Sequence, residues 1–278
     1  MMRELVALTR RELLRIARNP QAIITSLLLP ILYLVLFGQA FNLNSIGQGK
    51  VSPAAFLYIY RGAPNYFSYF AAGMTGFIAV TATLFVGANV IFDRLFGVLK
   101  RTAASPATAT SIFGSRLIAG SIQPIGLAFL VLGLAILLGR LGLAGLSVTA
   151  SVTAVGAAEV VLAVVILSMM FASLFIAIGF SLEQPQTYFA VVNAINLPVL
   201  LTSAALFPWG TMPAWFQNVA SFNPITLAVN VVRENLFAGA AAYYPYDPEV
   251  YLLGLVGWAL AMFVIATLLA RRALAPRR

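Results

Sequence analysis

The sequence offers few side chains that could carry out covalent or redox chemistry. It contains no histidine and no cysteine, which removes the commonest general base, the thiol nucleophile, the disulfide and the usual zinc ligands. Its eight acidic residues are scattered, without the paired carboxylates of acid–base catalysis. We therefore expect no metal site on this chain, and we expect that it is not an enzyme.

The sequence also lacks the loop that most ATP-hydrolysing proteins use to hold phosphates. That loop needs a glycine, four residues, and then Gly-Lys followed by a hydroxyl residue. Lys50 follows a glycine but precedes valine, and Lys100 follows leucine. The chain is therefore not expected to bind or hydrolyse ATP by this route.

Glu159 is the one acidic residue that falls well within a long apolar stretch. An ionisable group in a membrane is costly and is a candidate functional site. The alternative, which we favour, places it near the outer end of its helix, facing water or Arg140.

The elements that must position these residues are apolar helices. The chain is 61% hydrophobic and 9% charged, with a mean hydropathy of +0.95, whereas soluble domains have about 25% charged residues. A spanning helix needs about 20 apolar residues, and backbone groups in lipid must bond within their own segment. The predicted fold is an all-α polytopic membrane protein with six transmembrane helices, near residues 21–41, 68–91, 117–139, 155–180, 187–207 and 250–270.

Basic residues predict the orientation of these spans. An even number of spans places both termini on one side, and that side holds thirteen of the 17 basic residues. They are Arg3, Arg10, Arg11, Arg15, Arg18, Arg94, Lys100, Arg101, Arg116, Arg271, Arg272, Arg277 and Arg278, against Lys50, Arg61, Arg140 and Arg233 on the other side. The positive-inside rule then places both termini in the cytoplasm, in a cell membrane. The net charge of +9 indicates a membrane surface rather than a nucleic acid as partner.

The first 19 residues have the pattern of an amphipathic helix. One face carries Leu5, Leu8, Leu13 and Ile16, and basic residues including Arg10, Arg11 and Arg15 lie elsewhere around the helix. This pattern is typical of a helix lying along the membrane surface. A simple positive flank of the first span explains it equally well.

Residues 208–238 are too polar and too often broken by proline to span a membrane. Pro213 is suited to the first turn of one short helix, which carries Trp215, and Asn223-Pro224 to the start of a second. We expect two re-entrant helices, beginning after Pro208, that dip into the outer leaflet without crossing it.

Three motifs, in order along nearly the whole chain, carry a family resemblance. The loop 92–112 reads Asp93-Arg94, Gly97, Lys100-Arg101 and Ser105-Pro106, and it resembles the central motif of type-2 ATP-binding-cassette (ABC-2) exporter permeases. The segment from Leu206 to Glu234 is similar to the family's second hallmark, and Arg18-Asn19-Pro20 leading to Phe37-Gly38 is similar to its first span. One departure is Ala109-Thr110, where the family often has arginine.

The resemblance implies how such a permease would work. It implies that loop 92–112 is the coupling element of a separate ATPase subunit, which binds ATP and magnesium, while this chain carries no cofactor. Asp93 and Arg94 would pair or bond across to the ATPase, Gly97 would allow a sharp turn, and Ser105-Pro106 would end a helix. A simple interfacial anchor is the alternative for Asp93 and Arg94.

The resemblance further implies a second copy of the chain, with the pathway between the copies, membrane lipid around them and a second ATPase contact on the N-terminal helix. Polar residues on the second and fifth spans could line that pathway, namely Thr81, Thr83, Asn89, Asn193 and Asn196. Hydrogen bonding between helices is the other explanation for them.

Export of amphipathic drugs, lipids or lipid-linked molecules is the function that the resemblance implies. Polysaccharide export is an alternative within the family. An ion-coupled secondary transporter is the alternative outside it, and it would work without an ATPase.

Overall fold

The computed structural model describes residues 2–18, 28, 31–34, 36, 52–98, 102, 108–140 and 152–274, and every regular element in these ranges is a helix. The elements are α1 (Met2–Ala17), α4 (Pro53–Ile59), α5 (Tyr66–Thr81), α6 (Thr83–Leu95), α8 (Ala109–Arg140), α9 (Ala154–Ser181), α10 (Pro185–Leu201), η1 (Trp209–Thr211), α11 (Ala214–Phe222), α12 (Pro224–Leu236), η2 (Ala240–Tyr243) and α13 (Pro248–Leu274). The predicted all-α class is confirmed.

Four helical segments are long and apolar enough to cross a membrane: Tyr66–Leu95, Thr110–Arg140, Ala154–Ser181 and Pro248–Ala270. They coincide with four of the six predicted spans. Of the predicted span at 21–41, the structure describes only residues 28, 31–34 and 36. The predicted fifth span, 187–207, corresponds to α10, which ends at Leu201 because the chain then turns and offers its carbonyl groups to Arg233. The count of six spans stays a prediction.

The first of these segments consists of two helices that meet at Ala82. The Thr81 hydroxyl donates to the Phe77 carbonyl at 2.8 Å, and the Thr83 hydroxyl donates to the Val80 carbonyl at 2.5 Å. Hydroxyl groups that bond back to the preceding turn often bend helices. The two threonines flank the junction between α5 and α6.

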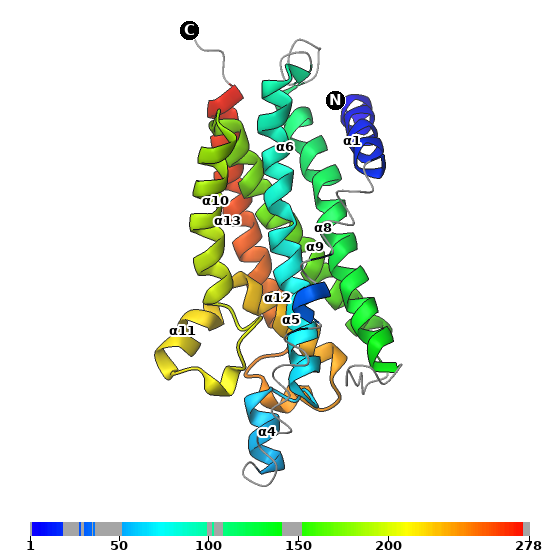
Figure 1. Cartoon of the computed structure of the whole chain (residues 1–278), viewed down its shortest axis with the longest axis vertical. Helices are drawn as coiled ribbons and strands as arrows, with labels where there is room; N and C mark the ends of the chain where they lie inside the picture. Colours follow the sequence, from blue (N-terminus) through cyan, green and yellow to red (C-terminus); the bar gives the residue numbers. More distant parts are fainter. Residues whose placement is uncertain are drawn as a thin grey trace.

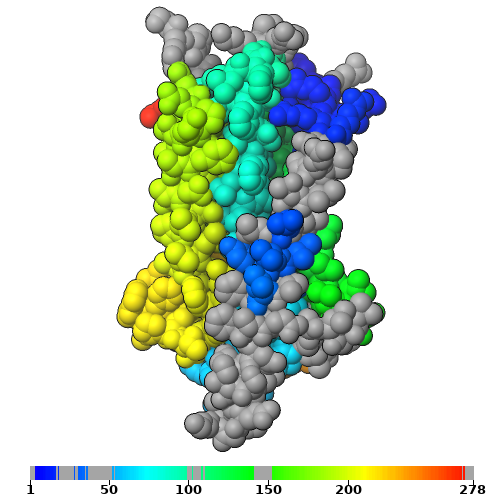
Figure 2. All heavy atoms as spheres, in the orientation of Figure 1, coloured from blue at the N-terminus to red at the C-terminus, as the bar shows by residue number. Residues whose placement is uncertain are grey.

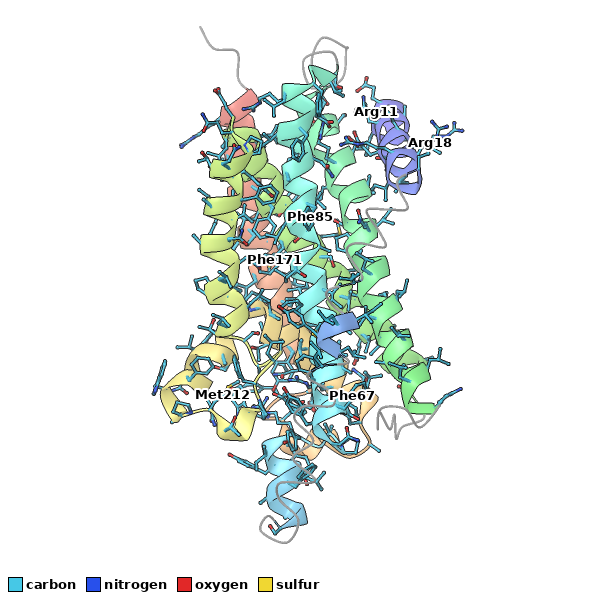
Figure 3. The ribbon with its side chains drawn as sticks, in the orientation of Figure 1. Arg11, Arg18, Phe67, Phe85, Phe171 and Met212 are labelled. Carbon is cyan, nitrogen blue, oxygen red and sulfur yellow. The ribbon has the colours of Figure 1, made fainter. Side chains whose placement is uncertain are left out.

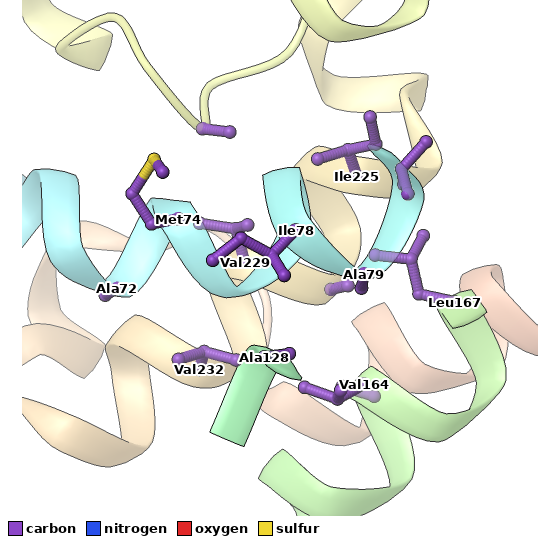
Figure 4. Packing of buried hydrophobic residues seen from close by; sticks show 14 of the residues in the cluster. Ala72, Met74, Ile78, Ala79, Ala128, Val164, Leu167, Ile225, Val229 and Val232 are labelled. Atoms are coloured by element: carbon purple, nitrogen blue, oxygen red, sulfur yellow. The ribbon is translucent and has the colours of Figure 1, made fainter. Parts of the chain in front are cut away.

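Helix α9 is the centre of the bundle and contacts α5, α6, α8, α12 and α13 (Figure 1). Small residues allow the closest approach: a Cβ built on Gly87 of α6 would lie 2.2 Å from the Phe175 carbonyl oxygen of α9. Close approach at glycine is a common device for packing helices in membranes. Figure 4 shows the core at the crossing of α5, α9 and α12, formed by Met74, Ile78, Ala79, Val164, Leu167, Ile225, Val229 and Val232.

Large apolar side chains also cover the outside of the bundle. On α13, Leu253 is 71% exposed, Leu260 62% and Val264 56%. Such an apolar outer face is unfavourable in water and favourable against lipid. It agrees with the membrane character predicted from composition.

The bundle has two different ends. Helix α1 and the end of α13 lie at one end, and α4, η1 and α11 lie at the other (Figure 1). We call them the α1 end and the α4 end. In the space-filling view α1 lies against the upper part of the bundle, while α10 and α11 form the left edge of the same face (Figure 2). Arg11 and Arg18 are at the α1 end, and Phe67 and Met212 are near the α4 end (Figure 3).

Candidate functional site

The α1 end contains a charged junction centred on Asp93. This residue lies in the last turn of α6 and is only 3% exposed. Its Oδ1 accepts a hydrogen bond from Arg15 of α1 at 2.8 Å. Its Oδ2 lies 2.7 Å from the Nη2 atom of Arg116 of α8, an ion pair whose atoms are not aligned as a hydrogen bond. One carboxylate therefore holds three helices together.

Arg94 does not pair with Asp93. Its guanidinium donates to the carbonyl oxygens of Leu182 at 2.8 Å and Phe180 at 2.5 Å, at the end of α9. The last carbonyl groups of a helix lack intrahelical donors, and a cation there also suits the helix dipole. Both predicted coupling residues thus bond within the chain, where they join α6 to α1, α8 and α9. A direct contact of either residue with an ATPase stays a prediction.

Helix α6 ends in the sharp turn expected at Gly97. This residue has a left-handed φ of 71°, and its N–H donates to the Arg94 carbonyl oxygen at 3.1 Å. Glycine is the residue that adopts this conformation without strain. The turn leaves Leu95 58% and Phe96 75% exposed. The other predicted coupling residues, Lys100, Arg101, Ser105 and Pro106, lie outside the described residues.

Helix α1 forms as predicted, but its apolar face packs on protein. Leu8 packs against the cluster that contains Ile112, Phe113 and Leu117 of α8. Arg10, Arg11 and Arg15 are exposed. A pocket of about 370 Å³ separates α1 from the end of α6 and is lined by Arg11, Glu12, Arg15, Asp93, Phe96 and Val98. Whether α1 also lies on a membrane surface stays a prediction.

The α4 end holds a buried arginine that the sequence placed among the outer charges. Arg233 of α12 is 0% exposed, and its guanidinium lies 3.4 Å from the centre of the Tyr69 ring. It donates to the carbonyl oxygens of Tyr69, Ala204 and Ala205 at 2.7–3.2 Å. No carboxylate within the described ranges forms an ion pair with it. Arg233 therefore fixes α12 to the start of α5 and to the turn after α10.

Arg61 is a second buried cation at this end. It is 5% exposed and lies 3.6 Å from the Trp209 ring centre and 4.8 Å from that of Tyr244. Such stacking is worth about 2 kcal/mol or more when it is desolvated. Neither arrangement could be predicted from the sequence, because both depend on residues that are far apart along the chain.

The two short helices predicted in residues 208–238 are present. Helix α11 follows Pro213, and α12 follows Asn223, whose Oδ1 accepts from the Ile225 N–H at 2.9 Å with Pro224 in the first turn. The Pro208 carbonyl accepts from Thr211 in the η1 turn before them. Trp215 is 67% exposed on α11, whereas most of α12 is buried in the bundle. The depth of these helices in a membrane stays a prediction.

The five predicted pathway residues fall into two groups. Thr81 and Thr83 bond to carbonyls of their own segment, and Asn196 is 3% exposed. Asn89 of α6 and Asn193 of α10 are exposed. Asn89 accepts from Arg15 at 3.4 Å. A lining role thus stays a prediction, and it suits the two exposed asparagines best.

Glu159 lies near the start of α9 at the α4 end and is half-buried. Its Oε2 accepts from the Asn235 side chain of α12 at 2.9 Å. The prediction had water or Arg140 as its neighbour and missed Asn235, which is 76 residues away in the sequence.

Comparison with known proteins shows which protein family this chain resembles. Residues 3–237 match the model of the family described as ABC-2 type transporter. A protein of Porphyra purpurea named as the transport permease ycf38 is 28% identical, over 83% of this chain and 72% of its own length. A protein of Mycobacterium tuberculosis named as the doxorubicin resistance ABC transporter permease DrrC is 24% identical, over 81% and 74%. The daunorubicin resistance ABC transporter permease DrrB1 of Streptomyces coeruleorubidus is 22% identical, over 68% and 65%.

Proposed function

Because the chain belongs to the ABC-2 type transporter family, we propose that it is the permease of an ATP-driven exporter for amphipathic drugs, lipids or lipid-linked molecules. One observation carries this proposal: the family match extends over residues 3–237 of a chain that has no ATP-binding loop. ATP and magnesium would then bind to a separate ATPase subunit.

The substrate class rests on two relatives. DrrC and DrrB1 are named for resistance to doxorubicin and daunorubicin. An amphipathic drug of that kind is therefore the first substrate to test on this chain.

Coupling would begin at the loop after α6. The ATPase would push on loop 92–112, in which the apolar side chains of Leu95 and Phe96 are exposed. Asp93 and Arg94 would then act inside the permease, because they tie the moving end of α6 to α1, α8 and α9. Since α9 also contacts α12, a shift at the α1 end would reach the α4 end through one central helix.

In a membrane, the α1 end would face the cytoplasm. Arg10, Arg11, Arg15 and Arg18 are all exposed there, as the positive-inside rule expects. The α4 end would then be outside, and α11 would place Trp215 and Phe222 in the outer leaflet. The Trp258 side chain of α13 donates to the Phe222 carbonyl. At 1.5 Å per residue, Trp258 is about 15 Å along α13 from its first residue, a depth that supports re-entry without crossing.

Two copies of the chain would assemble with two ATPases in the cell membrane. The test is co-purification in mild detergent with candidate cassette ATPases, followed by ATP turnover and drug uptake in inside-out proteoliposomes. We expect stable assembly, turnover altered by this chain, and uptake that stops with an ATPase variant unable to hydrolyse ATP. Uptake driven by an ion gradient without any ATPase would instead establish a secondary carrier.

A further inference from the structure

Three acidic side chains from three elements gather at the α4 end. Glu234 lies near the end of α12, Glu159 near the start of α9, and Asp247 immediately before α13. The charges of Asp247 and Glu159 both act on Glu234. No three acidic side chains in the described ranges lie close enough together to hold a metal ion.

Hydrogen-bond donors around Glu234 are directed elsewhere. The Asn235 side chain donates to Glu159 and to a backbone carbonyl. The Arg233 guanidinium donates to carbonyls at the start of α5 and in the turn after α10. The Arg61 guanidinium is stacked on two aromatic rings. Glu234 keeps one carboxyl oxygen buried without a hydrogen-bond partner. An ionised oxygen in that position loses its water and gains no donor, which disfavours the charged form.

The remaining titratable groups that face Glu234 are two phenols. Tyr244 follows η2, Tyr251 lies in α13, and both interact electrostatically with Glu234. The buried Tyr244 hydroxyl has no hydrogen-bond partner of its own, whereas Tyr251 also interacts with Asn230 and with the Tyr246 backbone. Burial first, and then the charges of Asp247 and Glu159, raise the pKa of Glu234 to about 7, against the opposing effect of Arg61. A carboxyl group in these surroundings changes its charge near neutral pH.

We propose that Glu234 is a proton-binding site that controls how closely α12 packs against α9 and the start of α13. With the proton bound, Glu234 is neutral and the three elements pack as the structure shows. Without it, Glu234 repels Glu159 and Asp247 and drives α12 away from them. Little free space absorbs this strain, because a Cβ on Gly156 of α9 would lie 2.3 Å from the Asn235 side chain.

Loss of the proton from Glu234 would also affect the contacts that Arg233 makes. Arg233 precedes Glu234 on α12 and fixes that helix to α5 and to the turn after α10. A displacement of the Glu234 end of α12 therefore strains the Arg233 contacts. The external pH would set the ease of opening at the α4 end, and this inference stands whichever substrate the protein carries.

The chain contains no cysteine, so a single introduced cysteine gives an unambiguous reporter. Leu236 is 6% exposed on α12, two residues after Glu234. We would measure the rate at which a maleimide modifies Leu236→Cys in the purified full chain, with Glu234 and with Glu234→Gln, near pH 6 and near pH 8. At each pH, the rate measured with Glu234 is divided by the rate measured with Glu234→Gln. This ratio removes the effect of pH on the ionisation of the cysteine thiol, which is common to both variants.

We expect equal rates near pH 6 and a rate about three-fold or more higher with Glu234 than with Glu234→Gln near pH 8. Asp247→Asn should move the midpoint of the change to lower pH, because Glu234 then ionises more easily. Glu249→Gln, which removes an exposed acid from the first turn of α13, is the matched control and should leave the profile unchanged. A rate ratio that is the same at both pH values, or a Glu249→Gln variant that behaves like Glu234→Gln, would overturn the proposal. Because this readout requires no transport, it can fail while the exporter function holds.

Discussion

Replacing Asp93 by asparagine tests the charged junction at the α1 end. The change keeps the side-chain shape and removes the charge that neutralises Arg116, whose side chain is 6% exposed. Removing one partner of a buried ion pair costs about 3–5 kcal/mol, because the other charge is left uncompensated. The pair with Arg15 is different, since the Arg15 side chain is 44% exposed and pairs of that kind are worth less than about 1 kcal/mol. Asp93→Asn should therefore destabilise the bundle strongly and also release α1.

Two measurements separate these effects. Thermal unfolding in detergent reports on the bundle, and the reactivity of a Leu8→Cys reporter reports on the docking of α1 against α8. Arg15→Gln should raise the reactivity of the reporter with little change in unfolding temperature. Asp93→Leu combined with Arg116→Met should restore the unfolding temperature, since apolar replacement of a buried pair is often neutral or stabilising, while the reporter stays reactive.

The reasoning is refuted if Asp93→Asn unfolds at the wild-type temperature and its Leu8→Cys reporter reacts as slowly as in the parent. With the ATPase present, Asp93→Asn should still assemble and hydrolyse ATP but transport less substrate per ATP. Loss of assembly in the Asp93→Leu, Arg116→Met variant, once its unfolding temperature is restored, would instead favour a direct contact of Asp93 with the ATPase, as the family resemblance implied.

Three further predictions concern single side chains. Gly87→Ala places a methyl group against the backbone of α9 and should lower the unfolding temperature, whereas Gly126→Ala, with no atom within 4 Å, should maintain or raise it. Arg233→Met leaves buried carbonyl groups without a donor, at a cost of about 1–3 kcal/mol each. It should therefore lower the unfolding temperature far more than Arg140→Met, which changes an exposed residue at a helix end. Equal losses of stability in the two variants would contradict the role of the buried guanidinium. The pKa of Glu234 is raised from 4.5 to about 7, so between these two pH values the folded chain binds more protons than the unfolded chain. The stability of the fold should therefore fall as the pH rises from 4.5 to about 7. Unfolding temperatures measured across this range should change less with pH in Glu234→Gln than in the parent chain.

Local signals in the sequence predicted the helices well. Apolar length predicted four spans, seven of their eight ends to within four residues and the start of the third seven residues late, because a bilayer demands a continuous apolar stretch. Pro213, Asn223 and Pro224 predicted where the short helices begin, and Gly97 predicted the turn after α6. Each of these features depends only on neighbouring residues.

Distant partners were not predictable in the same way. Asp93 and Arg94 were expected to pair with each other or to bond across to an ATPase, whereas the partners of Asp93 within the chain are 78 and 23 positions away on other helices. Arg233 was counted with the outer charges because it lies between the fifth and sixth predicted spans. Its partners are backbone carbonyls, which leave no mark in the composition of the chain.

The use of carbonyls follows from the charge balance of the chain. With 17 basic and eight acidic residues, most arginines cannot find a carboxylate. Helix ends supply the alternative, because their last carbonyl groups lack donors and carry the negative end of the helix dipole. Arg94 uses the end of α9, and Arg233 uses the turn after α10. A guanidinium in such a place joins two segments of backbone directly, with no second flexible side chain between them. Movement of α6 should therefore reach α9 with little loss, as the proposed coupling through the loop after α6 requires.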